Sequence, residues 1–261
     1  MFLRIILLLL QKYNMRIVLL SDIHMSYDGK SIWETDVLFH LKLCVSTIKK
    51  LKDIDVVIIA GDISNDGNVF SYEIIDKMFQ GIDIPMYCCP GNHDCLQNLK
   101  QTLSFIKYEK YLFLKGWKFI FLNSVVPDDV DLNTNKARGY LNDLDLKSVE
   151  DSLLLDSCNT IIVFHHPVIE PEGWLNRKLL DNKKQFVDLV SKYNHVKMVL
   201  MGHVHSYYQK KINNTLYVTA PSIGYAFNAE LPKFQIDVGE EGFLLIDTDL
   251  QSIEKIKLGD M

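Results

Sequence analysis

Short apolar runs of strand length recur along the whole chain, and this rhythm constrains the fold more than any other feature. The runs are rich in Val, Ile and Leu, and several lack polar alternation, which is typical of strands that are buried on both faces. They span residues 16–20, 56–60, 86–89, 119–123, 160–164, 197–201, 216–220 and 243–247. We therefore expect a sheet core that is covered on both sides.

Helix-like amphipathic stretches separate the first six runs. They cover residues 34–52, 68–80, 95–107, 142–156 and 176–193, with Asp143, Asp145 and Asn176 as expected helix-start residues. Alternating strands and helices predict an α/β layered fold with mostly parallel pairing. From about residue 197 the strands follow one another without helices, so we expect an antiparallel portion that completes or doubles the sheet.

Length and composition fit one large domain over residues 15–261. The chain has 261 residues, 48% of them apolar and 23% charged, and no repeat or Pro/Ser-rich linker divides it. A net charge of −5 argues against nucleic acid polymers as partners, because their binding depends on Lys and Arg, but a small anion could bind through metal ions. The five cysteines suggest no disulfide framework and favour a reducing, cytoplasmic location.

Residues 1–14 form an N-terminal extension whose role the sequence leaves open. Residues 2–10 are apolar apart from Arg4, which is too short for a bilayer span of about 20 residues and a weak match to a signal peptide. The segment that begins at Met15 resembles the start of a fold. We consider three roles: a non-structural extension, an extra helix on the body, or a membrane contact through residues 2–10. The first two are favoured.

Polar residues able to bind metals follow five of the apolar runs, just past the point where each strand should end. Six of the eight histidines lie in these motifs. Because ligands bind at the carboxyl edge of strands in α/β sheets, we expect the side chains to converge. The motifs are Asp22-Ile23-His24, Gly61-Asp62, Gly91-Asn92-His93-Asp94, His165-His166-Pro167 and Gly202-His203-Val204-His205.

The residue types in these motifs indicate a pair of divalent cations. Carboxylate and amide oxygens combined with imidazole nitrogens suit Mn, Fe or Zn, in divalent or mixed-valence form, better than a Cys-rich structural zinc site. The candidate donors are Asp22, His24, Asp62, Asn92, His165, His203 and His205. Seven donors are too many for one ion but suit two ions about 3.5–4 Å apart, an arrangement that activates water in phosphoryl transfer.

Each motif alone also has a simpler structural explanation. Asp22 could cap a helix, Gly61-Asp62 is a common turn, and His165-His166-Pro167 could be a loop at a strand end. The pair His203 and His205 is more specific, since alternate residues of an extended segment point to one side. The occurrence of all five motifs in this order, each at a strand end, favours the metal site.

The order D-x-H, G-D, G-N-H-D, H-H-P, G-H-x-H resembles the calcineurin-like metallophosphoesterases from Asp22 to His205. The resemblance implies a four-layer α/β/β/α sandwich with the metals at the sheet edge. It assigns His93, oriented by Asp94, to protonating the leaving oxygen or stabilising the developing charge, and makes His166 a neighbour of the ligands. The first cation would be held by Asp22, His24 and His205, the second by Asn92, His165 and His203, with Asp62 bridging.

Within that family, the length of the chain and the local sequence of its motifs resemble those of the bacterial class III cyclic-nucleotide phosphodiesterases. The sequence 61–67, the double histidine before Pro167 and Ala220-Pro221-Ser222 carry this likeness, while Asn65 replaces the metal-binding Tyr of the purple acid phosphatases. The resemblance implies a small phosphoester substrate, with 3′,5′-cyclic AMP first. The alternatives are a broader phosphodiesterase or phosphomonoesterase, acting on glycerophosphodiesters or 2′,3′-cyclic nucleotides, and a non-catalytic metal-binding scaffold. Oligomeric state is not visible in the sequence.

Aromatic residues in two loops are candidates for stacking on a nucleobase. Trp174 follows the His165-His166-Pro167 motif, and Tyr225 and Phe227 follow the Gly202–His205 motif. The simpler expectation, which we favour, is that each of them packs a loop over the core.

Overall fold

The apolar runs nearest the N-terminus form the centre of one sheet. The computed structural model describes residues 14–126 and 137–260. In this sheet the strand order is β12-β11-β1-β2-β3-β4, with β1–β4 parallel and β11 and β12 antiparallel at one edge. The strands are β1 (Arg16–Leu20), β2 (Val56–Ala60), β3 (Met86–Cys89), β4 (Ile106–Lys107), β11 (Gly242–Asp247) and β12 (Ser252–Lys257).

A second sheet has parallel strands inside and one antiparallel strand at each edge. Its order is β5-β6-β7-β8-β10-β9, where β5 and β9 are the antiparallel edge strands. The strands are β5 (Tyr111–Leu114), β6 (Trp117–Phe121), β7 (Asn159–Val163), β8 (Val196–Met201), β9 (Tyr208–Ile212) and β10 (Thr215–Thr219). The expected antiparallel portion is therefore divided between the two sheets.

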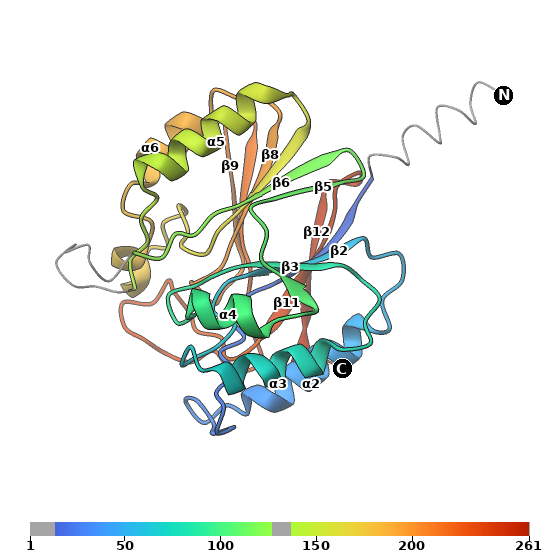
Figure 1. The fold of residues 1–261 in the computed structure, drawn as a ribbon. Coiled ribbons are helices and arrows are strands. Elements are labelled where there is room, and N and C mark those ends of the chain that lie inside the picture. The colour runs from blue at the N-terminus through green and yellow to red at the C-terminus, as the bar shows by residue number, and fades with distance from the viewer. Residues whose placement is uncertain (1–13, 127–136, 261) are drawn as a thin grey trace.

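Alternate residues of the central strands enter different cores, which explains why the runs lack polar positions. On β1, Ile17 and Leu19 pack between the two sheets, whereas Val18 and Leu20 pack against helices. The first sheet is covered by α2 (Val37–Ile48), α3 (Val69–Phe79) and α4 (Leu96–Thr102), and the second by α5 (Asp143–Leu155) and α6 (Lys183–Val190) (Figure 1). The four-layer α/β/β/α sandwich is confirmed.

Helix starts differ in part from the sequence expectation. The side chain of Asn142, not Asp143, caps α5 by accepting the backbone N–H of Asp145 at 2.9 Å. Asn176 lies inside the 3₁₀ helix η1 (Trp174–Lys178) instead of starting the helix α6. An amide side chain one position earlier satisfies the free N–H groups of the first turn equally well, so composition alone leaves the choice open.

The predicted helix over 95–107 is too long. The helix α4 ends at Thr102 because Asp76 of α3 takes over the following backbone: its Oδ1 accepts the N–H groups of Ser104 and Phe105, each at 2.9 Å. The chain then enters β4. A second 3₁₀ helix, η2 (Leu258–Asp260), ends the described part of the chain.

All five cysteines are free thiols, and Cys44, Cys88 and Cys89 are buried. Within residues 14–126 and 137–260, no helix is long and apolar enough to cross a membrane. The proposals made for residues 1–13, including a membrane contact through residues 2–10, lie outside the described residues.

Candidate metal centre

The carboxyl ends of β1, β2, β7 and β8 meet at one edge of the sandwich. The N–H of Asp22 donates to the carbonyl of Gly61 and that of His24 to the carbonyl of Asp62, both at 3.0 Å, so the pairing of β1 with β2 continues into the two loops. Across the sheets, the N–H of His203 donates to Oδ2 of Asp22 at 3.0 Å. The edge thus brings loops from both sheets together.

One cluster of donors contains Asp22, His24 and His205. The Nε2 of His205 lies 3.2 Å from Oδ1 of Asp22 and 3.1 Å from Nε2 of His24. All three side chains are buried. The predicted members of the first metal site therefore lie together.

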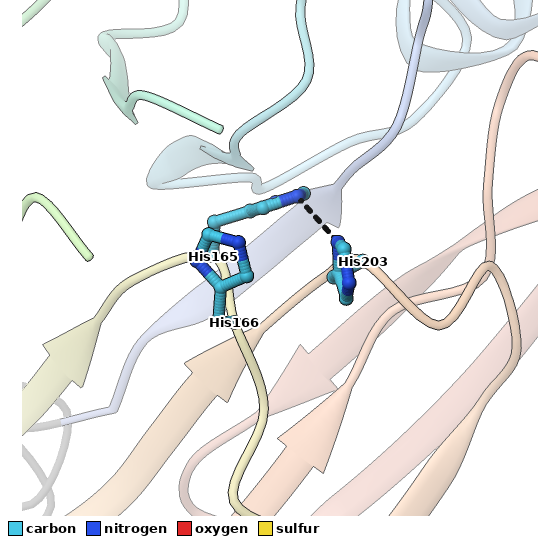
Figure 2. Close-up of side chains that lie close together, drawn as sticks. All are labelled: His165, His166 and His203. Carbon is cyan, nitrogen blue, oxygen red and sulfur yellow. Dashed lines mark hydrogen bonds between the residues drawn. The ribbon is translucent and has the colours of Figure 1, made fainter. Parts of the chain in front are cut away.

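The neighbouring cluster is joined to the first through Asp62. Its Oδ2 lies 3.5 Å from Nε2 of His24 and 3.3 Å from Nε2 of His165. The same His165 nitrogen lies 3.2 Å from Nδ1 of His203, as the dashed line in Figure 2 marks. The Oδ1 of Asn92 is buried and has no hydrogen-bond partner. Asp62 thus occupies the position expected of a bridging carboxylate.

Hydrogen bonds fix the ring orientation of three of these histidines. Each bonds an oxygen through Nδ1, which favours a proton on Nδ1 and directs Nε2 at the cluster. His203 is reversed, because its Nδ1 faces His165 and its buried Nε2 has no partner. The oxygens are Oδ1 of Asn65 for His24 (3.2 Å), O of Ala60 for His165 (2.8 Å) and O of Tyr225 for His205 (2.6 Å).

The electrostatics of the clusters favour bound positive charge. Burial alone would raise the pKa of Asp62, but His165 holds it well below the ordinary value. Burial would likewise lower the pKa of His165, yet the carboxylates of Asp62 and Asp22 raise it to about 9. Burial lowers the pKa of His24 to about 3. Two buried carboxylates are therefore poised to attract cations.

The donor set fits divalent cations on three structural grounds. Ring nitrogens of neighbouring histidines face one another at 3.1 and 3.2 Å, an arrangement that requires a proton or a cation between them. The buried Oδ1 of Asn92 lacks any partner, although such groups are normally satisfied. The mixture of carboxylate, amide and imidazole donors also suits borderline metals.

Left-handed backbone conformations are concentrated among these residues. A positive φ is uncommon for non-glycine residues and costs free energy. Five of the seven candidate donors have one: Asp22 (52°), His24 (53°), Asp62 (49°), His203 (72°) and His205 (50°). The sharp turns after the strands therefore aim these side chains at the centre at the expense of backbone strain.

Gly61 makes room for the second cluster. Its φ is +86°, and a Cβ atom there would lie 2.6 Å from Nδ1 of His165. Any side chain would be strained in that backbone conformation and would also displace the ring of His165. The glycine before Asp62 is thus required by the approach of the second sheet.

His93 stands at the mouth of the centre. It is exposed, and its ring meets the His24 ring edge-on with centroids 4.7 Å apart. Its Nδ1 bonds the carbonyl oxygen of Asn65 at 3.0 Å, and its backbone N–H donates to Oδ1 of Asp62 at 2.8 Å. His93 is therefore exposed to solvent while its ring contacts a buried donor.

The prediction that Asp94 orients His93 is wrong, because the Nδ1 of His93 bonds Asn65. Burial and the charge of Asp62 raise the pKa of Asp94 to about 6, although hydrogen bonds from the backbone of Ser64, Gly91 and Ile63 act to lower it. The carboxylate of Asp94 holds the loop backbone instead, since it accepts the N–H groups of Ile63, Ser64 and Gly91 and the hydroxyl of Tyr72.

The loop aromatics pack over the centre, in agreement with the expectation that each of them packs a loop over the core. Tyr225 and Phe227 are buried, and the Phe227 ring stacks on His205 with centroids 4.2 Å apart. Trp174 packs on Phe227 at 5.3 Å.

Sequence reasoning missed Ser124, whose Oγ lies 2.9 Å from Nδ1 of His166, because no motif surrounds it.

Known proteins with related sequences include two that are named as phosphodiesterases. A protein from Nostoc sp. named 3′,5′-cyclic-nucleotide phosphodiesterase is 28% identical over 242 residues, covering 90% of this chain and 88% of that protein. An Arcobacter nitrofigilis protein named "Probable glycerophosphodiester phosphodiesterase GpdQ" is 28% identical over 232 residues, covering 84% of this chain and 82% of its own length.

Solved structures share the fold. The crystal structure of a dimetal phosphatase from Danio rerio superposes with a TM-score of 0.65 at 13% identity, covering 94% of this chain and 99% of that one. At this identity the likeness concerns the fold alone. Residues 15–207 match the model of the calcineurin-like phosphoesterase family, and this chain belongs to that family.

Proposed function

We propose that this chain is a dinuclear metal-dependent phosphodiesterase that hydrolyses a 3′,5′-cyclic nucleotide, cyclic AMP first, to the 5′-monophosphate. The observation that carries the proposal is the pair of buried donor clusters that share Asp62 at the joint edge of two sheets. The name of the Nostoc relative supports the substrate class.

The residues of the two clusters would hold the cations, which we expect to be Mn, Fe or Zn. When bound, two such ions lower the pKa of a water molecule and neutralise the charge on phosphate oxygens. Asp62 would contact both ions. Asp22, His24 and His205 belong to the first site, and Asn92, His165 and His203 to the second.

His93 would assist departure of the leaving oxygen. Its Nδ1 proton is committed to the carbonyl of Asn65, so the opposite nitrogen, Nε2, remains available to carry a proton to a ligand. Its exposure and its contact with His24 support a role beside the substrate that is separate from the buried donors. This division of roles separates proton transfer from metal binding.

A second candidate substrate class is supported by one specific relative. The Arcobacter protein is named for glycerophosphodiesters and is as similar in sequence as the Nostoc protein. Both candidates would use the same donors, so only turnover distinguishes them.

A substrate panel on protein with measured metal content tests the proposal. The panel contains cyclic AMP, a 2′,3′-cyclic nucleotide, glycerophosphocholine and a phosphomonoester, each with Mn, Fe and Zn. We expect the highest kcat/KM with cyclic AMP. A higher value for glycerophosphocholine would transfer the assignment to the second class, and absence of turnover on every ester with two metals bound would indicate a scaffold.

Two variants separate metal binding from catalysis. Asp62→Asn should lose metal occupancy, because the shared carboxylate is weakened at both sites. His93→Ala should keep two metals and lose about 10²–10⁴-fold in kcat, the contribution of general acid–base catalysis. Metal analysis and steady-state rates on the same samples provide the measurement, and metal loss in His93→Ala would contradict this division of roles.

A further inference from the structure

A buried histidine next to the second cluster has one ring nitrogen without a hydrogen-bond partner. The side chain of His166 is completely buried, and Nδ1 lies 2.9 Å from Oγ of Ser124. Its Nε2 is also buried, but no hydrogen-bond partner lies within reach. A buried ring nitrogen without a partner costs free energy, so a ligand for it is expected.

His166 repeats the pattern of three proposed metal donors. His24, His165 and His205 each use Nδ1 to bond an oxygen atom, which leaves Nε2 for the centre. His166 does the same with Ser124. The hydroxyl oxygen of Ser124 also accepts the backbone N–H of His166 at 3.2 Å, which its two lone pairs allow.

The position of His166 is also that of a donor. One ring nitrogen from each of His165, His166 and His203 lies within 4.8 Å of the others. The ring centroid of His166 is 5.0 Å from that of His165 and 4.7 Å from that of His203. Figure 2 shows the three rings together, with His166 next to His165 and the dashed line running from His165 to His203.

Packing prevents the ring of His166 from turning away. A Cβ atom on Gly139 would lie 2.4 Å from Cβ and Cγ of His166, so the bare backbone of Gly139 presses on the ring. That backbone is itself fixed, because its N–H donates to the carbonyl of Leu179 and its carbonyl accepts the N–H of Asp181. The orientation of His166 is therefore built into the fold.

We propose that His166 supplies a further nitrogen donor, Nε2, to the second cation, next to His165 and His203. The proposal rests on the dinuclear centre proposed above. An additional imidazole makes the second site richer in nitrogen, which favours Zn or Fe over oxygen-preferring ions such as Mg. Ser124 then acts as the positioning residue that keeps the proton on Nδ1.

Nuclear magnetic resonance of the wild-type protein tests this directly. Zn²⁺ is titrated into metal-free protein labelled with ¹⁵N-histidine, and the ring nitrogens are followed. We expect Nε2 of His166 to show the metal-bound shift in the same step as Nε2 of His165. A proton that stays on Nε2 of His166 after two equivalents would overturn the proposal and make His166 a hydrogen-bond donor. If His165 and His205 do not respond either, the metal centre itself is refuted.

Matched variants give a second measurement. His166→Leu should weaken binding of the second Zn²⁺ at least tenfold by calorimetry and leave the first unchanged. His195→Leu is the control, because Nε2 of His195 also lacks a partner but lies before the start of β8, away from the centre. Equal affinities in His166→Leu and wild type, with folding verified by circular dichroism, would contradict the proposal.

Discussion

Backbone strain at individual proposed metal donors has a measurable consequence. At His24, where φ is 53°, glycine should be better tolerated than alanine, because a left-handed conformation costs an L-residue about 1–2 kcal/mol. In metal-free protein we expect His24→Gly to be more stable than His24→Ala by about 1 kcal/mol. Urea unfolding of both variants measures the difference.

His165 provides the control, since it is not among the residues with positive φ. There the order should reverse, with His165→Gly less stable than His165→Ala by about 0.5–1 kcal/mol, the usual cost of glycine flexibility. The same order of stability at both positions would show that strain at His24 is not the cause.

Asp94 should matter for stability more than its place in a catalytic motif suggests. Its replacement by alanine leaves three backbone N–H groups without their acceptor, so we expect a loss of about 2–4 kcal/mol. Tyr72→Phe removes only the hydroxyl that donates to Asp94 and accepts from Cys95, and should cost about 1–2 kcal/mol. Chemical unfolding of the two variants would contradict this if Tyr72→Phe were the more damaging.

At the residue scale the sequence predicted which side chains gather and not how they are held. Donor types and strand-end positions identify Asp22, Asp62 and His165 because convergence follows from parallel strands. The partner of His93 is a backbone carbonyl, that of Asn65, and any residue type carries a carbonyl. Such bonds leave no trace in a sequence, so the motif suggested Asp94 instead.

At the element scale, the central strands were predictable and the edge strands were not. β2 coincides with its apolar run and is buried at every position. The edge strands β9 (YQKKI) and β12 (SIEKIK) carry several charged residues and are largely exposed or half-buried. Edge strands commonly carry such charges, and their pairing depends on a neighbour that is distant in sequence or on a turn.

The contact between α5 and β6 rests on a buried lysine. Lys118 of β6 is 1% exposed, and its Nζ donates to the carbonyl of Ser152 (2.6 Å) and to Asp156 (3.0 Å) at the end of α5. Asp156→Ala should cost about 1–2 kcal/mol, below the value for a fully buried pair because Asp156 itself is partly exposed. Urea unfolding near neutral pH measures this loss.

This contact should also depend on pH. Burial would raise the pKa of Asp156, but hydrogen bonds from the Cys158 N–H and from Lys118 hold it below the ordinary 3.8. A depressed pKa in the folded state contributes stability above the unfolded-state value and loses it as pH falls through the folded value. Between about pH 5 and pH 3, wild type should therefore lose more stability than Lys118→Met. Parallel slopes would contradict this assignment.

At the scale of the whole molecule, the proposed metal centre joins two separately built sheets. Asp22, Asp62 and Asn92 follow strands of one sheet, and His165 and His203 follow strands of the other. Ions that bind only the folded state should stabilise it by about 2.7 kcal/mol at a hundredfold excess over Kd. We expect chelation to lower Tm in wild type and to leave Tm of Asp62→Asn nearly unchanged, as calorimetry can show.

Because of the left-handed turns described above, the stability of the folded chain should depend on the same ions that its activity requires. In a chain that has assembled its sandwich without ions, two carboxylates and several ring nitrogens lie close together on a backbone with positive φ, and bound ions would relieve the repulsion between these groups. The supply of cations in the cell would then affect the amount of folded protein as well as its activity. Scarcity of metal would lower the amount of folded protein before it lowered the rate of the enzyme.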